Sequence, residues 1–176
     1  MSSRAVIALG SNLGDREATL RDAVRAVDAI EGVTVVGASG FVESFAVKPD
    51  GVDESSPNYL NAVIIADAEL QPLDLLDELG RIEHAHGRTR ETVWGDRTLD
   101  LDLIAFGDVE LQTERLTLPH PRAWQRAFVV VPWLQVDPDA VLPGHGRVAE
   151  LEARTDGSVW EHPAAPLFPA VGEVES

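Results

Sequence analysis

The sequence predicts an α+β fold, a ferredoxin-like antiparallel sheet with helices packed on it. Segments with strand-like alternation and segments with helix-like spacing follow one another in the order β-α-β-β-α-β. The chain also lacks the glycine-rich phosphate-binding motifs of P-loop and dinucleotide-binding folds. A simple doubly wound sheet is therefore not expected, and any phosphate group would be held by side chains and metal ions.

The chain opens with a strand and an amphipathic helix. Residues 4–9 are expected to form a short strand that is apolar after Arg4 and ends at Gly10. Residues 15–30 are expected to be helical, with Asp15 as the N-cap and Gly32 as the stop. The apolar residues of this helix recur at three- and four-residue spacing: Leu20, Ala23, Val24, Val27 and Ile30.

The central part alternates loosely at 33–47 and again at 58–70, which predicts strands. Between them, residues 48–57 are rich in Pro, Gly, Ser and Asp and predict a loop. Pro72 suits the first turn of a second helix over 73–86.

The last predicted elements are a strand over 98–106 and a helix over 122–136, which Pro132 must kink or end. We expect the helices to lie on one face of the sheet. The length of 176 residues fits one domain, placed at 1–160. From about residue 155 the chain becomes rich in Pro, Ala and Gly, and residues 161–176 are expected to be a weakly ordered tail.

Composition limits the classes of function. The net charge of −16 argues against nucleic acid or an anionic membrane as a general partner. Cysteine is absent, so thiol chemistry is excluded. Neither a signal peptide nor an apolar run of about 18 residues is present. A cytoplasmic monomer without a membrane partner is the expectation.

Two aspartates on the last strand are the strongest chemical signal. Leu99, Leu101 and Leu103 share one face of the strand, and Asp100 and Asp102 share the other, roughly 6–7 Å apart. Paired carboxylates suit Mg²⁺, which usually binds one or two carboxylates plus substrate phosphates. The alternative is an acidic, solvated strand face, which is common in half-exposed strands.

Arginines surround this acidic pair in the sequence. Arg88, Arg90 and Arg97 lie just before it in a segment with neither helical nor strand periodicity, which predicts a mobile loop. Their planar guanidinium groups suit phosphate oxygens. Arg115 and Arg126 follow the strand. Each arginine taken singly has an alternative role as a solvated surface residue. Residues 88–126 hold six Arg against seven Asp and Glu, so the acidic excess lies elsewhere.

Seven segments, in order between residue 5 and about residue 140, together resemble one known family. They are ALGSNLGD at 8–15, YLNA at 59–62, RIE at 81–83, GRTR at 87–90, WGDRTLDLD at 94–102, LPHPR at 118–122 and RAF at 126–128. This combination is similar to the 6-hydroxymethyl-7,8-dihydropterin pyrophosphokinases of folate biosynthesis. The resemblance implies transfer of the β,γ-diphosphate of ATP to the hydroxymethyl oxygen of the dihydropterin, with release of AMP.

The resemblance also assigns site residues. It implies that Asp100 and Asp102 bind two Mg²⁺ ions together with ATP, and that Asp100 also lies at the pterin. Further ATP contacts are implied at Glu83, Arg88, Arg90, Trp94, Arg97, Arg115, Thr117 and His120. Arg88, Arg90 and Arg97 are also implied as catalytic, and Arg90 and Trp94 as part of a loop that seals the site.

For the pterin, the resemblance implies two sandwiching rings, Tyr59 and Phe128, with Asn61 reading the ring edge and Arg126 nearby. Ser44 is a further candidate, but the family's usual Thr-x-Pro is here Ser44-Phe45-Ala46, so that contact is less secure. Residues 10–15 are interpreted as mainly architectural. Tyr59 and Phe128 could also be ordinary core aromatics, and the remaining histidines are interpreted as surface residues: His84, His86, His145 and His162.

Two other classes of function remain open. A binding module could hold Mg-nucleotide or pterin without turnover, and a metal-dependent phosphohydrolase could release phosphate or AMP without the pterin. Formation of AMP in step with pterin diphosphate distinguishes the transferase from both.

Overall fold

The computed structural model describes residues 2–11, 15–44, 46–48, 51–53, 58–86, 99–155 and 159–162. Its elements occur in the order β1 (Ser3–Ser11), α1 (Arg16–Asp28), β2 (Val33–Ala38), β3 (Phe41–Ser44), β4 (Ala46–Lys48), β5 (Gly51–Asp53), β6 (Tyr59–Ala68), α2 (Pro72–Ala85), β7 (Asp100–Phe106), β8 (Leu111–Gln112), β9 (Thr117–Leu118), the 3₁₀ helix η2 (Ala123–Gln125), α3 (Ala127–Val136), β10 (Val141–Leu142), β11 (Gly146–Arg147), α4 (Val148–Leu151), the 3₁₀ helix η3 (Glu152–Arg154) and β12 (Val159–His162).

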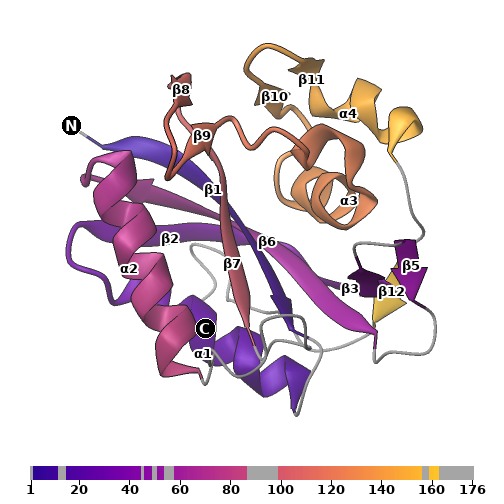
Figure 1. Cartoon of the computed structure of the whole chain (residues 1–176), viewed down its shortest axis with the longest axis horizontal. Coiled ribbons are helices and arrows are strands. Elements are labelled where there is room, and N and C mark those ends of the chain that lie inside the picture. The colour runs from indigo at the N-terminus through magenta and orange to yellow at the C-terminus, as the bar shows by residue number, and fades with distance from the viewer. Residues whose placement is uncertain are drawn as a thin grey trace, which may run out of the picture.

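The main sheet is antiparallel, as the sequence predicts. Its strands lie in the order β12, β3, β6, β1 and β7, and β2 pairs with the end of β6 that β3 leaves free. All of these pairs are antiparallel. Strand β1 therefore lies between β6 and β7, which brings the two longest strands and the acidic strand side by side (Figure 1). The predicted α+β class and antiparallel sheet are confirmed.

The helix boundaries follow local signals. The carboxylate of Asp15 accepts a hydrogen bond from the Ala18 N–H at 3.1 Å, so Asp15 is the N-cap of α1 as predicted. Gly32 has φ +86°, a conformation that glycine adopts without strain, and it ends the turn after α1. Pro72 begins α2. Pro132 lies inside α3 and does not end it, because α3 continues to Val136.

Helices cover both faces of the sheet, so the prediction of a single covered face is wrong. Helices α1 and α2 pack on one face, and α3 and α4 pack on the other (Figure 1). The side chains of β1 divide accordingly, since successive residues of a strand point to opposite faces. Its first-face residues are Ala5, Ile7 and Leu9, and its second-face residues are Val6 and Ala8.

The segment predicted as a loop at 48–57 contains a strand. Strand β5 pairs with β4 in a short hairpin, Ala46 opposite Asp53. Three-residue strands are too short to show a period in the sequence, and Gly51, which favoured a loop, begins β5. No helix in the described part of the chain is both long enough and apolar enough to cross a membrane.

Candidate active site

Strand β7 places the two aspartates on the face of the sheet that α3 and α4 cover in part. Leu99, Leu101 and Leu103 are buried at 0%, 4% and 2% exposure against the α1 and α2 side, whereas Asp100 and Asp102 are half-buried on the other side. In the pairing with β1, Asp100 lies opposite Gly10 and Asp102 opposite Ala8. The predicted division of this strand into an apolar and an acidic face is confirmed.

Glu83 fixes the outer edge of β7 between the two aspartates. Its side chain is buried, and Oε2 accepts a hydrogen bond from the Leu101 N–H at 2.7 Å. Strand β7 is the outermost strand of the described sheet, so this N–H has no neighbouring strand to bond. A buried carboxylate that satisfies a backbone donor rigidifies the strand. Glu83 thus holds the acidic pair in register from α2.

Positive and titratable groups surround Asp102. Burial lowers the pKa of the Arg126 guanidinium and Asp102 opposes that effect. Burial likewise lowers the pKa of His120, against the attraction of Asp102 and together with Arg126 and Arg122. The Arg122 N–H donates to His120 Nδ1 at 3.2 Å, so the neutral ring carries its proton on Nε2. A neutral imidazole donor and a guanidinium therefore stand beside the acidic pair.

Asn61 and Ser44 form a buried polar pair on the same face. Asn61 Nδ2 donates to Ser44 Oγ at 2.8 Å, and the two residues are only 4% and 5% exposed. Asn61 lies opposite Gly10 of β1 on one side and opposite Val42 of β3 on the other. Ser44 lies opposite Tyr59. Strands β3 and β6 thus place three of the predicted pterin residues next to one another.

Gly10 contributes no side chain to this row. It is paired with Asn61 on one side and with Asp100 on the other. A Cβ at Gly10 would lie 3.2 Å from Asn61 Oδ1 and 3.5 Å from Tyr59 Cδ1. Gly10 therefore leaves room for the side chains of Asn61 and Tyr59 to lie against the backbone of β1, which fits the interpretation of this residue as mainly architectural. A glycine inside a strand is the sequence signal for such a close approach.

The two expected aromatic residues lie at the edges of this face. Tyr59 begins β6 and Phe128 lies in the first turn of α3, and both are half-buried. The guanidinium carbon of Arg126 lies 5.6 Å from the centre of the Phe128 ring, a cation–π contact. Phe128 packs against the core beneath α3 with one side, which leaves the rest of its ring accessible.

The remaining expected ATP residues lie beyond β7. Arg115 is exposed and forms an ion pair with Asp77 of α2, a partner that could not be identified from local sequence. Thr117 is half-buried in β9, which packs beside β7.

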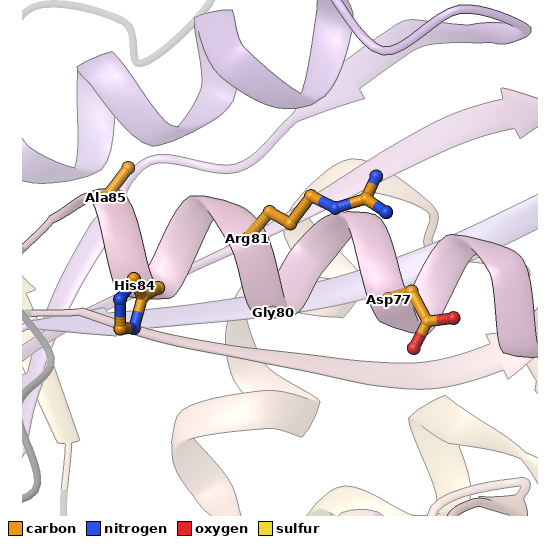
Figure 2. A pocket seen from close by; sticks show the side chains of 5 residues that line it. All are labelled: Asp77, Gly80, Arg81, His84 and Ala85. Carbon is orange, nitrogen blue, oxygen red and sulfur yellow. The ribbon is translucent and has the colours of Figure 1, made fainter.

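A shallow hollow of about 500 Å³ lies on the outside of α2 (Figure 2). Its lining residues are Asp77, Gly80, Arg81, His84 and Ala85.

Four predicted residues lie outside the described residues: Arg88, Arg90, Trp94 and Arg97. Within the described ranges, no group of three or more His, Asp or Glu side chains is arranged to hold a metal ion. A cation at Asp100 and Asp102 would therefore need further ligands from its substrate and from water, which is the usual manner of Mg²⁺.

Comparisons with known proteins match most of this chain to one family. Residues 6–138 match the family model of 7,8-dihydro-6-hydroxymethylpterin-pyrophosphokinase. A Haemophilus influenzae protein named 2-amino-4-hydroxy-6-hydroxymethyldihydropteridine pyrophosphokinase is 43% identical over 147 residues, 84% of this chain and 89% of its own length. Proteins of the same name from Synechocystis and Methylorubrum extorquens are 38% and 40% identical and cover 97% and 89% of this chain. The alignments span 85% and 96% of those two proteins.

Solved structures show the same fold. A wild-type Plasmodium falciparum HPPK-DHPS superposes with a TM-score of 0.62 at 12% identity, over 87% of this chain. An HPPK-DHPS described as a complex with substrates superposes with a TM-score of 0.66 at 10% identity, also over 87% of this chain. The match covers only 44% of each of those chains, so it concerns one part of a longer protein.

Proposed function

This chain belongs to the 7,8-dihydro-6-hydroxymethylpterin-pyrophosphokinase family, and we infer that it transfers diphosphate from ATP to the hydroxymethyl group of 6-hydroxymethyl-7,8-dihydropterin. AMP is the second product, and the reaction belongs to folate biosynthesis. The observation that carries this inference is one row across the sheet, where Asn61, Gly10 and Asp100 lie side by side on β6, β1 and β7. An amide and a carboxylate in line, with no side chain on the strand between them, suit a flat heterocycle that carries a reactive alcohol.

The pterin is proposed to lie over this row. Asn61 offers both a donor and an acceptor to a ring edge that has both, and its bond to Ser44 sets the orientation of the amide. Tyr59 and Phe128 are proposed to stack on the two ring faces, a geometry favoured by flat aromatic surfaces. Arg126 is proposed to border the same pocket, since it contacts Phe128 and is electrostatically coupled to Asp102.

Asp100 and Asp102 are proposed to hold two Mg²⁺ ions together with ATP. The fit rests on two half-buried carboxylates on one strand face, kept in register by Glu83, with a glycine opposite Asp100. When bound, Mg²⁺ would offset the charge of the phosphates and polarise the acceptor hydroxyl. In the transfer, the hydroxymethyl oxygen bonds to the β-phosphorus as the bond from that phosphorus to the α-phosphate oxygen breaks, and the hydroxyl proton is lost.

The ATP side is proposed to use cationic and neutral donors. His120 carries its proton on Nε2 when neutral, so it can donate to a phosphate or ribose oxygen. Arg115 and Thr117 are proposed as further contacts beside β7, and Glu83 as a contact and a support. The phosphate clamp is proposed to come from Arg88, Arg90 and Arg97, with Trp94 helping to exclude water. A monomeric state and a cytoplasmic location also stay predictions.

The deciding experiment incubates the purified chain with ATP, Mg²⁺ and the dihydropterin alcohol and measures AMP and pterin diphosphate together. The proposed function requires the two products in equal amounts and no AMP when the pterin is left out. Tight ATP binding without AMP would support a binding module. AMP or phosphate formed without the pterin would support a phosphohydrolase.

A further inference from the structure

The C-terminal strand β12 lies beside the pterin side of the site, although it falls outside the part of the chain that the family model matches. That match ends at residue 138, whereas β12 comprises Val159–His162. It pairs with β3, with Val159 opposite Ser44 and His162 opposite Phe41 (Figure 1). The main sheet thus extends two residues past the domain boundary predicted at residue 160, and its last strand covers the edge of the strand that carries Ser44.

His162 joins three elements through one imidazole ring. Its Nε2 lies 2.8 Å from Glu17 Oε2 of α1, and its Nδ1 lies 3.3 Å from Glu43 Oε2 of β3. The ring also meets Phe41 edge-on, with centroids 6.1 Å apart. With its side chain only 22% exposed, His162 is not the surface residue that the sequence predicted. Both ring nitrogens face carboxylates, so both can donate only when the ring is the imidazolium.

Glu43 is connected through Arg16 to the residue that precedes β6. Arg16 Nη1 donates to Glu43 Oε1 at 3.0 Å and to the Asn58 carbonyl oxygen at 2.9 Å. Asn58 directly precedes Tyr59, and Glu43 directly precedes Ser44. His162, Glu43 and Arg16 therefore connect the two strand ends from which Ser44, Tyr59 and Asn61 project.

The ion cluster of His162, Glu17, Glu43 and Arg16 lies on the face of the sheet opposite the one where the pterin is proposed to bind. Glu43 shares the face of Phe41, which packs in the core of α1 and α2, and Ser44 points the other way because strand residues alternate. The charged groups around the imidazole are Glu17, Arg16 and Arg21 of α1 and Glu43 of β3. Arg21 pairs with Glu17 at 3.6 Å and lies over the Phe41 ring. Glu161 of β12 is exposed and points away from this cluster.

We propose that His162 is a positioning residue for the dihydropterin. As the imidazolium, it donates hydrogen bonds to Glu17 and Glu43, which hold β12 and α1 against β3 and so fix Ser44 and the start of β6. The proposal rests on the proposed function, because it assumes that these strands read the pterin. The hydrogen bond with Glu17 raises the pKa of His162, and the bond with Glu43 acts in the same direction. Both hydrogen bonds of His162 are therefore present at mildly acidic pH, and one of them is lost as the pH rises and the ring loses its proton.

The test compares His162→Ala and His162→Gln with Glu161→Ala, a control on the same strand. Steady-state kinetics with saturating MgATP give KM for the dihydropterin, and the reverse arrangement gives KM for ATP. At about pH 6, we expect His162→Ala to raise KM for the dihydropterin about 5- to 10-fold, while kcat and KM for ATP stay within about twofold. His162→Gln, which keeps one donor without the charge, should fall between wild type and His162→Ala. Glu161→Ala should match wild type.

The pH profile separates positioning from a general structural role. The ratio of the His162→Ala and wild-type KM values should fall toward one above the pKa of His162, because the neutral ring of the wild type can no longer donate to both Glu17 and Glu43. Glu17→Gln removes the negative charge of the nearer acceptor and should move this change to lower pH, even if His162→Ala folds poorly. A ratio that is independent of pH, or a His162→Ala variant that behaves like Glu161→Ala, would overturn the proposal. A wild-type chain that forms no AMP would instead refute the proposed function itself.

Discussion

The two faces of the main sheet are built from the same strands but have different roles. The face under α1 and α2 is closed by apolar side chains along its length. The opposite face is apolar only beneath α3 and α4, and it carries Asn61, Asp100 and Asp102 at the other end of its strands. Because side chains alternate along a strand, neighbouring residues serve folding and chemistry separately. A substitution of a core residue or of a site residue should therefore affect one of these properties and spare the other, whereas His162 is proposed to serve both, because its ion pairs with Glu17 and Glu43 also position Ser44.

The largest effect is expected at the acidic pair. Asp100→Asn and Asp102→Asn should each lower kcat about 1,000-fold or more, because the charge that is proposed to hold the cations is lost. The free energy of unfolding should change by about 1 kcal/mol or less, because relief of the repulsion between the two carboxylates is offset by the lost attraction of Asp102 for Arg126. Product formation and urea unfolding measure the two effects. Asp108→Asn, in the exposed turn after β7, is the control. Turnover within tenfold of wild type would contradict the metal assignment.

The opposite result is expected one residue away. Leu101→Ala should cost about 2–5 kcal/mol in the free energy of unfolding, because Leu101 is 4% exposed on the closed face and its loss leaves a cavity. The folded fraction should keep most of its kcat, since Leu101 does not face the site. Urea unfolding followed by circular dichroism gives the stability, and activity is normalised to folded protein. A variant that is stable but inactive would show that the two faces are not independent.

Much of the closed face could be predicted from the sequence, because its signals are local. The spacing of apolar residues predicted α1 and α2, Asp15 predicted a cap, and the alternation of leucine and aspartate predicted β7. The second helical layer was misplaced, because nothing local in α3 or in the four-residue α4 shows which face of the sheet it covers. Strand β12 was missed for a related reason, since it is short and its partner β3 is more than 100 residues away in the sequence.

The site divides in the same way. The spacing of Asp100 and Asp102 is local, and it predicted their shared face. The hydrogen bond from Leu101 to Glu83 and the contacts of His162 join distant segments, so no single window of the sequence contains them. The resemblance to a known family named Asn61 but not its bond to Ser44. Candidate residues could therefore be named from the sequence, whereas the contacts that orient them needed the fold.

An intermediate effect is expected where the open face lacks a side chain. Gly10→Ala should raise KM for the dihydropterin about 10-fold, because its Cβ would lie 3.2 Å from Asn61 Oδ1 and would displace the amide that is proposed to read the ring edge. The free energy of unfolding should change by about 1 kcal/mol or less. Gly80→Ala is the matched control, since a Cβ there meets no atom within 4 Å. Equal KM values for wild type and Gly10→Ala would place the pterin away from this row.

The smallest effect concerns the ion cluster at the closed face, where stability and pH are linked. The hydrogen bond with Glu17 raises the pKa of His162, so this contribution is complete below the unfolded pKa of about 6.5 and is lost as the pH rises through the folded value. The bond with His162 lowers the pKa of Glu17. Burial would raise the pKa of Glu43, but its bonds from Arg16 and His162 outweigh burial and lower it. The two glutamates therefore stabilise the fold above about pH 4.5 and lose that contribution as the pH falls.

The difference in unfolding free energy between wild type and His162→Ala, measured with urea at a series of pH values, should be largest between about pH 4.5 and 6.5 and should shrink on both sides. A difference that stays constant into the alkaline range would show that His162 stabilises β12 by packing on Phe41 and that its charge contributes nothing to the closed face.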